Sequence, residues 1–264
     1  MNDRVRVDIE EGVADVRLVR GDKHNGLDRR MFEALIEAGS SLIDDKSLRA
    51  VVLSGEGPSF CAGLDFASLM REGMNPAQLL APQEGSSANT AQRAAWVWAE
   101  VPVPVIAALH GHVYGGGLQI ALAADIRFVT ADAKLSVREI NWGLIPDMTG
   151  TQTLRHLVRL DVAKELVFTG RSVPGTEAVE IGLATRVVAD PRATALEAAR
   201  QVAQRSPDAI RGAKRILNVA GTISTEDGLK LEEEIQRGVL GKPNQMEAVM
   251  AGMQKRAPNF KDPA

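Results

Sequence analysis

The stretch ALHGHVYGGGLQIALA, residues 108–123, connects two apolar runs. The run over 103–109 predicts a buried strand, and the run over 118–124 predicts a buried helix. Gly115, Gly116 and Gly117 leave bare backbone N–H groups at the start of that helix, where the helix dipole adds positive potential. Such a place can hold an anion or a developing oxyanion. Taken alone, three glycines more often form a tight, closely packed turn. The run lacks the spacing of a dinucleotide-binding loop, so a nucleotide cofactor is a weak interpretation.

Upstream of this stretch, the sequence predicts two strands, a helix and a third strand. Apolar and polar residues alternate over 5–9 and 13–19, which is typical of two strands joined by a tight hairpin at Glu11-Gly12. Residues 28–43 carry apolar side chains at helical spacing, with Asp28 as the expected N-cap. A short apolar strand over 48–54 follows and ends in a turn rich in glycine and proline.

The rest of the chain predicts a loop and two further strands, and after residue 149 the pattern becomes almost entirely helical. Residues 73–93, rich in Gly, Pro, Gln, Ser and Asn, predict a mobile surface loop or a broken helix, with a helix over 94–100 after it. Residues 126–130 predict a strand, and residues 187–188 a short one. The expected helices after residue 149 cover 163–168, 175–181, 192–205, 210–219, 226–239 and 245–256.

Composition excludes several classes of protein. The 264 residues are 45% hydrophobic and 25% charged, which is ordinary for a globular chain. A net charge of -3 and 4% aromatic residues make nucleic acid an unlikely main partner. One cysteine, Cys61, excludes a disulfide within the chain and disfavours a zinc site; we expect it to be a small buried residue. Neither a signal peptide nor a membrane-spanning segment is visible, so a cytoplasmic protein without a membrane partner is the expectation.

Three further segments could carry chemistry. SFCAGLD, residues 59–65, follows a predicted strand and turn, and its Ala62-Gly63-Leu64 could supply a further N–H. VREINWGL, residues 137–144, and IPDMTGT, residues 145–151, follow the strand predicted over 126–130. Each segment alone is weak evidence.

Taken together and in order, these segments closely resemble the crotonase family, the enoyl-CoA hydratases and isomerases. The resemblance runs from RGDKHNGL, residues 20–27, to KRAPNFKD, residues 255–262. It implies an α/β fold: a spiral of β-β-α turns over residues 1–200 and a helical trimerisation region over 201–264. It also implies a homotrimer or a dimer of trimers that acts on an acyl-CoA thioester. Coenzyme A would be carried as part of the substrate, with no separate cofactor and no metal.

The resemblance also places a site on particular residues. The backbone N–H groups of Leu64 and Gly116 would form an oxyanion hole for the thioester carbonyl, because moving a proton next to a thioester creates an enolate-like oxygen. The residues that would contact the substrate are Lys23, His24, Asn25, Gly26, Leu27, Ala62, Gly63, Asp65, Gln119, Trp142 and Lys255.

The carboxylates indicate which reaction to expect. Hydratases of the family use two glutamates, and the corresponding positions here hold Gln119 and Glu139. An amide cannot act as a general base toward water, which disfavours efficient hydration. Asp147, eight residues after Glu139, gives the chain the paired glutamate and aspartate of dienoyl-CoA isomerases, although these normally have a further acidic residue where Gln119 stands. We therefore expect Glu139 and Asp147 to be catalytic, with double-bond isomerisation favoured over hydration.

Alternatives remain open at this stage. Asp147 could cap a helix that begins near Thr149, Glu139 could pair with Arg138 at the surface, and Gln119 could either hydrogen-bond within the turn or hold substrate. The chain could be a hydratase with Glu139 as its main acid and base. It could also be a hydrolase, dehalogenase-like or ring-forming member of the family, a non-catalytic acyl-CoA-binding trimer or, more distantly, a cofactor-dependent oxidoreductase.

Overall fold

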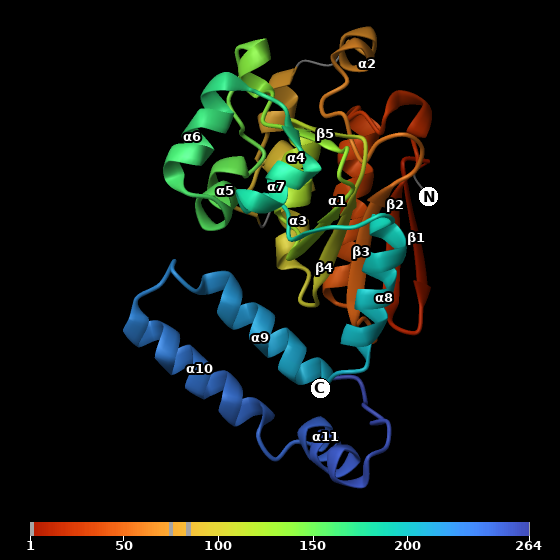
Figure 1. Cartoon of the computed structure of the whole chain (residues 1–264), viewed down its shortest axis with the longest axis vertical. Coiled ribbons are helices and arrows are strands. Elements are labelled where there is room, and N and C mark those ends of the chain that lie inside the picture. The colour runs from red at the N-terminus through yellow and green to blue at the C-terminus, as the bar shows by residue number, and fades with distance from the viewer. Residues whose placement is uncertain (1–2, 74–75, 83–85, 264) are drawn as a thin grey trace.

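Two β-sheets form the centre of the molecule in this computed structural model, which describes residues 3–73, 76–82 and 86–263 (Figure 1). The β1–β2 pair is antiparallel and the other neighbours in the larger sheet are parallel. In spatial order, the larger sheet contains β1 (Val5–Glu10), β2 (Val13–Leu18), β3 (Ala50–Gly55), β4 (Val105–Leu109), β6 (Ile126–Val129) and β9 (Arg186–Val187). The smaller sheet contains β5 (His112–Tyr114), β7 (Lys134–Ser136) and β8 (Val173–Pro174).

The chain passes repeatedly from the larger sheet to a second layer, and this makes a spiral. After β2 it reaches Leu27, which forms a parallel bridge with Leu64, the residue reached after β3. Cys61 likewise pairs with Val113 in β5, which follows β4. Strand β5 then pairs in parallel with β7, which follows β6. Segments that are far apart in sequence but follow successive parallel strands therefore lie side by side in the second layer.

Helices cover the sheets and form the C-terminal part. Within the described residues, no helix is long and apolar enough to cross a membrane. The α-helices are α1 (Arg29–Ile43), α2 (Phe66–Arg71), α3 (Thr90–Glu100), α4 (Gly116–Leu122), α5 (Gly150–Leu157), α6 (Leu160–Thr169), α7 (Gly175–Glu180), α8 (Pro191–Ala203), α9 (Pro207–Val219), α10 (Thr225–Val239) and α11 (Pro243–Gln254). The 3-10 helices are η1 (Gly21–Lys23), η2 (Pro76–Leu80) and η3 (Glu139–Trp142).

Two apolar clusters hold these layers together. The larger one fills the space between the sheets and helices α1, α3 and α4, and Phe32 and Trp98 are among its fully buried side chains. The smaller one joins the other face of the larger sheet to α8, where Ala195 and Ala199 pack against strand residues such as Val52. Removing this apolar surface from water is the main favourable contribution to the fold.

The C-terminal helices α9–α11 lie below the sheets in Figure 1. Lys214 of α9 is buried and anchors them: its Nζ donates to the Val103 carbonyl at 3.0 Å and pairs with Asp125 at 2.7 Å. Burial lowers the pKa of Lys214, and the Asp125 carboxylate opposes this shift. The domain boundary predicted at residue 200 falls in the last turn of α8.

Several local predictions are confirmed. Glu11 and Gly12 both have positive φ, as a tight hairpin turn requires, and the Asp28 side chain accepts a hydrogen bond from the Met31 N–H as the N-cap of α1. All six helices expected after residue 149 are present, with shifted ends.

Other local predictions are wrong. Strand β5 lies between the predicted strand and the glycine run and was not expected, nor were β7 and α2. Helix α3 begins at Thr90 rather than 94. Strands of three residues are too short to show alternation, and they form here because neighbouring turns of the spiral supply their hydrogen-bond partners. Of the stretch 73–93, residues 74–75 and 83–85 lie outside the described residues, and the rest includes η2 and the start of α3.

Candidate active site

The segments singled out in the sequence meet around one cavity of about 410 Å³. They come together because each one follows a parallel strand of the larger sheet and enters the second layer at a neighbouring position. Seven of the predicted site residues line this cavity: Ala62, Gly63, Leu64, Gly116, Glu139, Trp142 and Asp147. The rest of the wall is mostly apolar and includes Phe32, Phe66, Leu79, Leu80, Leu144 and Met148.

Two backbone N–H groups in this wall are available to a ligand. The bridge between Leu27 and Leu64 uses the carbonyl of Gly63 and the N–H of Asp65, and this leaves the Leu64 N–H outside the ladder. Gly116 is the first residue of α4, so its N–H has no acceptor one turn back. Across the described residues, neither N–H donates a hydrogen bond. This pair can therefore stabilise a developing oxyanion.

The glycines around these donors each have a separate structural reason. Gly63 has φ +85°, and a Cβ there would lie 2.7 Å from the Tyr114 carbonyl oxygen. A Cβ on Gly116 would lie 2.6 Å from Met148 Sδ, and one on Gly117 would lie 2.5 Å from the Cys61 carbonyl oxygen. The glycine run is thus both a close-packed turn and the support of the free Gly116 N–H.

Glu139 is buried and held by Gln119. The Gln119 Nε2 donates to Glu139 Oε1 at 2.5 Å, and Gln119 Oε1 accepts from the Gly150 N–H at 2.8 Å. The second contact fixes the amide orientation, so Gln119 can only donate to the carboxylate. Glu139 Oε2 is buried and has no hydrogen-bond partner among the described residues. Oε2 is therefore the oxygen left to exchange a proton with a ligand.

Asp147 faces the same cavity from the loop before α5. It does not cap that helix, whose N-cap is Thr149 and has no side-chain cap. Burial raises the pKa of Asp147. Burial also raises the pKa of Glu139, the hydrogen bond from Gln119 opposes that rise, and the charge of Asp147 adds to it. The two carboxyl groups are therefore coupled, and both retain protons to higher pH than free carboxyl groups do.

The loop that carries Asp147 contains a strained residue. Thr149 has φ +71°, which is uncommon for a β-branched residue. The next residue, Gly150, donates to Gln119, and a Cβ on Gly150 would lie 2.6 Å from Gln119 Oε1. The loop conformation thus joins Asp147, Gln119 and Glu139 into one arrangement, as expected where backbone strain is retained at a functional site.

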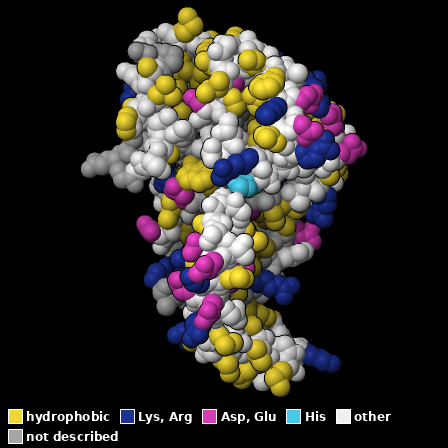
Figure 2. Space-filling view, turned by 90° about the vertical axis from the view of Figure 1, so that its left-hand side faces the viewer, with side chains coloured by type: hydrophobic (Ala, Val, Ile, Leu, Met, Phe, Trp, Pro, Cys, Tyr) yellow, Lys and Arg dark blue, Asp and Glu magenta, His cyan; other side chains and the backbone are white. Residues whose placement is uncertain are grey.

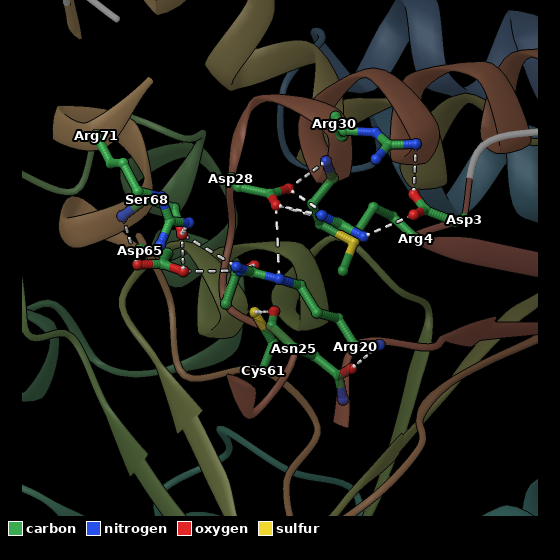
Figure 3. A network of polar contacts seen from close by, with 12 residues as sticks. Asp3, Arg4, Arg20, Asn25, Asp28, Arg30, Cys61, Asp65, Ser68 and Arg71 are labelled. Carbon is green, nitrogen blue, oxygen red and sulfur yellow. Dashed lines mark hydrogen bonds and ion pairs between the residues drawn. The ribbon is translucent and has the colours of Figure 1, made fainter. Parts of the chain in front are cut away.

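A buried arginine, Arg20, fixes the segment that carries Leu64 (Figure 3). Its Nη1 lies 2.8 Å from Asp65 Oδ2 and also donates to the Gly26 carbonyl, while Nη2 donates to Ser68. Asp65 in turn caps α2 by accepting from the Ser68 N–H. Burial opposes ionisation of Asp65, but its hydrogen bonds from Ser68 and Arg20 lower its pKa overall.

Replacing Arg20 should destabilise the protein strongly. We expect Arg20→Met to reduce the free energy of unfolding by about 3 kcal/mol, because it leaves the carboxylates of Asp65 and Asp28 with fewer partners at a buried position. Arg29→Met is the matched control, since Arg29 forms only an exposed pair with Glu33, and it should cost less than about 0.5 kcal/mol. Urea unfolding of both variants measures the difference; equal, small losses would contradict the assigned role of Arg20.

The other residues predicted to bind substrate do not line the cavity. Asn25 is buried and binds backbone groups: it accepts from the Arg20 N–H and donates to the carbonyls of Glu56 and Ser59. Gln119 is 1% exposed, so it contacts Glu139 rather than the cavity. The remaining members of this set are His24 and Lys23, both exposed, Gly26 and Leu27, both buried, Asp65 in the Arg20 network, and Lys255 at the end of α11.

Two open questions about single residues are answered by the geometry. Glu139 is buried against Gln119, so a surface pair with Arg138 is wrong. Cys61 is buried, its thiol donates to the Asn25 carbonyl, and burial raises its pKa to about 12, so it is a packing residue with little thiolate. In the part of the chain that the structure describes, no group of three or more His, Cys, Asp or Glu side chains could hold a metal ion.

Phe66, Tyr114 and Arg138 are among the lining residues that sequence reasoning missed. Phe66 packs against Trp142 in the cavity wall, with ring centroids 4.9 Å apart. Tyr114 and Arg138 form a second contact, with the guanidinium carbon 4.3 Å from the ring centroid. Phe66, Tyr114 and Arg138 each directly neighbour a residue that was singled out, namely Asp65, Gly115 and Glu139, and that adjacency was the available signal.

Comparison with known proteins gives a consistent result. The family model described as "Enoyl-CoA hydratase/isomerase" matches residues 8–263. Methylglutaconyl-CoA hydratase of Mus musculus is 31% identical over 257 residues, covering 95% of this chain and 80% of that protein. The Delta(3,5)-Delta(2,4)-dienoyl-CoA isomerase of Mus musculus is 31% identical over 265 residues, covering 94% of this chain and 78% of that protein.

Solved structures agree with the sequence relatives. The enoyl-CoA hydratase structure from Bacillus anthracis has a TM-score of 0.89 at 31% identity and covers 98% of this chain and 100% of that one. The enoyl-CoA hydratase structure from Mycobacterium tuberculosis H37Rv has a TM-score of 0.85 at 26% identity, covering 99% of this chain and 100% of that one.

Proposed function

Because the chain belongs to the enoyl-CoA hydratase/isomerase family and has the crotonase fold, we propose that it shifts the double bond of an enoyl- or dienoyl-CoA thioester. One observation carries the preference for isomerisation over hydration: Gln119 replaces a carboxylate, and both ends of its amide are already bound. Its side chain is only 1% exposed, and an amide cannot deprotonate a water. Asp147 instead supplies the second carboxyl group at the cavity.

The proposed reaction needs no co-reactant. The thioester carbonyl oxygen accepts from the N–H groups of Leu64 and Gly116. Glu139 Oε2 takes a proton from C2 of a 3-enoyl or 3,5-dienoyl thioester, and the negative charge moves onto the carbonyl oxygen. A proton then returns to the far carbon of the conjugated system, C4 or C6, and Asp147 is the donor. The substrate keeps all its atoms, and its double bonds have moved. Glu139 is left protonated and Asp147 ionised, and loss of a proton from Glu139 and gain of one by Asp147 through exchange with solvent restore the site.

The coupled carboxyl groups determine the order of proton transfer. Gln119 donates to Glu139 and stabilises its ionised form, so Glu139 is the base. Among the described residues no side chain donates a hydrogen bond to Asp147, and burial raises its pKa, which favours its protonated form. A pair of titratable groups in different environments is the usual way in which one site supplies both an acid and a base.

The test is the ultraviolet spectrum of the protein incubated with 2-enoyl-, 3-enoyl- and 3,5-dienoyl-CoA of matched chain lengths. The proposal predicts that conjugation develops in the 3-enoyl or the dienoyl substrate, faster than enoyl absorbance is lost from the 2-enoyl substrate. Loss of 2-enoyl absorbance as the faster reaction would favour the second candidate, a hydratase. That candidate is supported by the relatives that are named hydratases.

Gln119 should set the pH dependence of the reaction. A donor to the ionised carboxylate lowers its pKa, so Gln119→Met should raise the pKa of Glu139 further. Activity that needs ionised Glu139 rises with pH, and because the pKa of Glu139 is raised, the acidic limb of kcat/KM in the wild type should lie above the ordinary glutamate range. In Gln119→Met this limb should move to still higher pH. Gln152→Met, on the exposed face of α5, is the control and should leave the limb in place. A limb that does not move would contradict the role given to Gln119.

We further propose that the protein is cytoplasmic and assembles as a trimer or a dimer of trimers through its C-terminal helices. Figure 2 shows hydrophobic side chains at the lower end of the molecule, where α10 and α11 lie. The exposed apolar residues of α9–α11 include Leu217, Leu229, Leu240, Met246, Val249, Met250 and Met253. Faces of this kind mark interaction surfaces. Light scattering after gel filtration should give a multiple of the 28.3 kDa chain mass, and a stable monomer at micromolar concentration would contradict the proposal.

A further inference from the structure

Arg138 is a positive charge in an otherwise apolar part of the cavity. It lies directly before Glu139 and shares the cavity wall with Tyr114, Leu64 and Trp142. Its guanidinium lies 4.3 Å from the centre of the Tyr114 ring, which holds it in place. Over the described ranges, it forms no ion pair with any carboxylate.

The neighbouring groups do not neutralise this charge. His112 lies beside Tyr114, with ring centroids 4.7 Å apart, and His24 lies beside His112 at 5.5 Å. Burial lowers the pKa of His112, and the positive charges of His24, Lys134 and Arg138 lower it further, so the potential at this wall is positive. The carboxyl groups of Glu139 and Asp147 also line the cavity, but among the described residues neither forms an ion pair with Arg138.

We propose that Arg138 binds a carboxylate at the far end of the acyl group, so that the preferred substrates are monothioesters of short dicarboxylic acids. A guanidinium offers a planar fork of donors that matches a carboxylate, and a fixed guanidinium in an apolar wall favours an anionic partner over an apolar one. The inference rests on the proposed function in one respect: the thioester carbonyl must lie at the N–H groups of Leu64 and Gly116.

A phosphate of coenzyme A has the same charge chemistry, but the geometry favours the acyl end. Arg138 lies in the same wall as Gly116, Glu139 and Asp147, around a cavity of about 410 Å³. The pantetheine arm between thioester and phosphate is about as long as four extended residues, roughly 13 Å. With the thioester at Gly116, the phosphates therefore lie outside this cavity.

Binding of unreactive thioesters tests the inference without turnover. Calorimetry compares succinyl-, glutaryl- and adipyl-CoA with butyryl-, pentanoyl- and hexanoyl-CoA, and free coenzyme A serves as the reference for the phosphates. The wild type should bind at least one dicarboxylic thioester about tenfold or more tightly than its counterpart of equal carbon number. Arg138→Met should abolish that preference and leave free coenzyme A binding unchanged, and Arg138→Lys should retain part of the preference.

Arg186→Met is the matched control, because Arg186 also stacks on an aromatic ring, that of Phe128, but lies outside the cavity lining. It should leave the preference intact. The inference is overturned if no dicarboxylic thioester is preferred by the wild type. It is also overturned if Arg138→Met weakens free coenzyme A and all thioesters equally, which would assign Arg138 to a phosphate. A preserved preference in a protein that turns over no enoyl or dienoyl thioester would refute the proposed function alone.

Discussion

Glu139→Gln should reduce turnover about a thousandfold while the protein remains folded. The substitution keeps the shape of the side chain and still lets Gln119 donate to Oε1, but it replaces the free oxygen, Oε2, with an amide that cannot take a proton. Removal of a group that transfers a proton in the transition state costs about 10²–10⁴-fold. The measurement is kcat on the best substrate of the 3-enoyl and 3,5-dienoyl series.

The free energy of unfolding of Glu139→Gln distinguishes a catalytic role of Glu139 from a structural one. A raised carboxyl pKa means that the folded protein binds the proton more tightly than the unfolded chain, so stability falls as pH rises from the ordinary glutamate pKa through the raised one. A neutral amide removes this penalty, and Glu139→Gln should be at least as stable as the wild type at pH 7. The exposed Glu180→Gln is the control for activity. Retained turnover in Glu139→Gln, or a large loss of stability, would contradict the assignment of Glu139 as the base.

Asp147→Asn should reduce isomerisation about a hundredfold. The amide cannot return a proton to the far carbon, although it occupies the same place in the cavity wall. The amide is neutral, as the proposed proton donor is before it gives up its proton, so the acidic limb that reports Glu139 should stay in place.

The exposed Asp132→Asn is the matched control for Asp147→Asn and should behave as the wild type. If Asp147→Asn retains full isomerase activity, Asp147 is only a polar residue of the loop, and the argument for a paired acid and base fails. If the acidic limb moves in this variant, Asp147 is ionised in the active enzyme, and its role as the proton donor is wrong.

The larger elements of the fold were predictable because their pattern is local. The hairpin at Glu11-Gly12 depends on two positive φ angles, and α1 depends on an apolar stripe and the Asp28 cap. Strands β5 and β7 were not predictable in this way. Each has three residues, and each exists because the other pairs with it from the adjacent turn of the spiral. Long-range pairing leaves little trace in a short window of sequence.

The same distinction applies to the site: residues within local motifs were predictable, and residues positioned by distant contacts were not. Leu64, Gly116, Glu139 and Asp147 lie in motifs with a fixed order, and the structure brings all four to one cavity. The side chain of Gln119 was harder to place, because its orientation depends on the Gly150 N–H from a later loop. Arg20 lies in the motif at residues 20–27 but was not singled out, because its importance arises from buried partners in two segments, around Asp28 and around Asp65.

The central claim is that isomerisation is the faster reaction. It rests on Gln119, whose amide is hydrogen-bonded at both ends, and on Asp147, which shares the cavity with Glu139. It is tested most directly by chromatography, with ultraviolet and mass detection, of the initial products from an equimolar mixture of 2-enoyl- and 3,5-dienoyl-CoA with the wild-type protein. The 2,4-dienoyl isomer keeps the mass of its substrate and is identified by its conjugated ultraviolet spectrum, whereas a hydrate gains the mass of one water. The account predicts that the 2,4-dienoyl isomer forms first and that the hydrate of the 2-enoyl thioester lags well behind. A hydrate that forms as fast as the isomer, or faster, would contradict it.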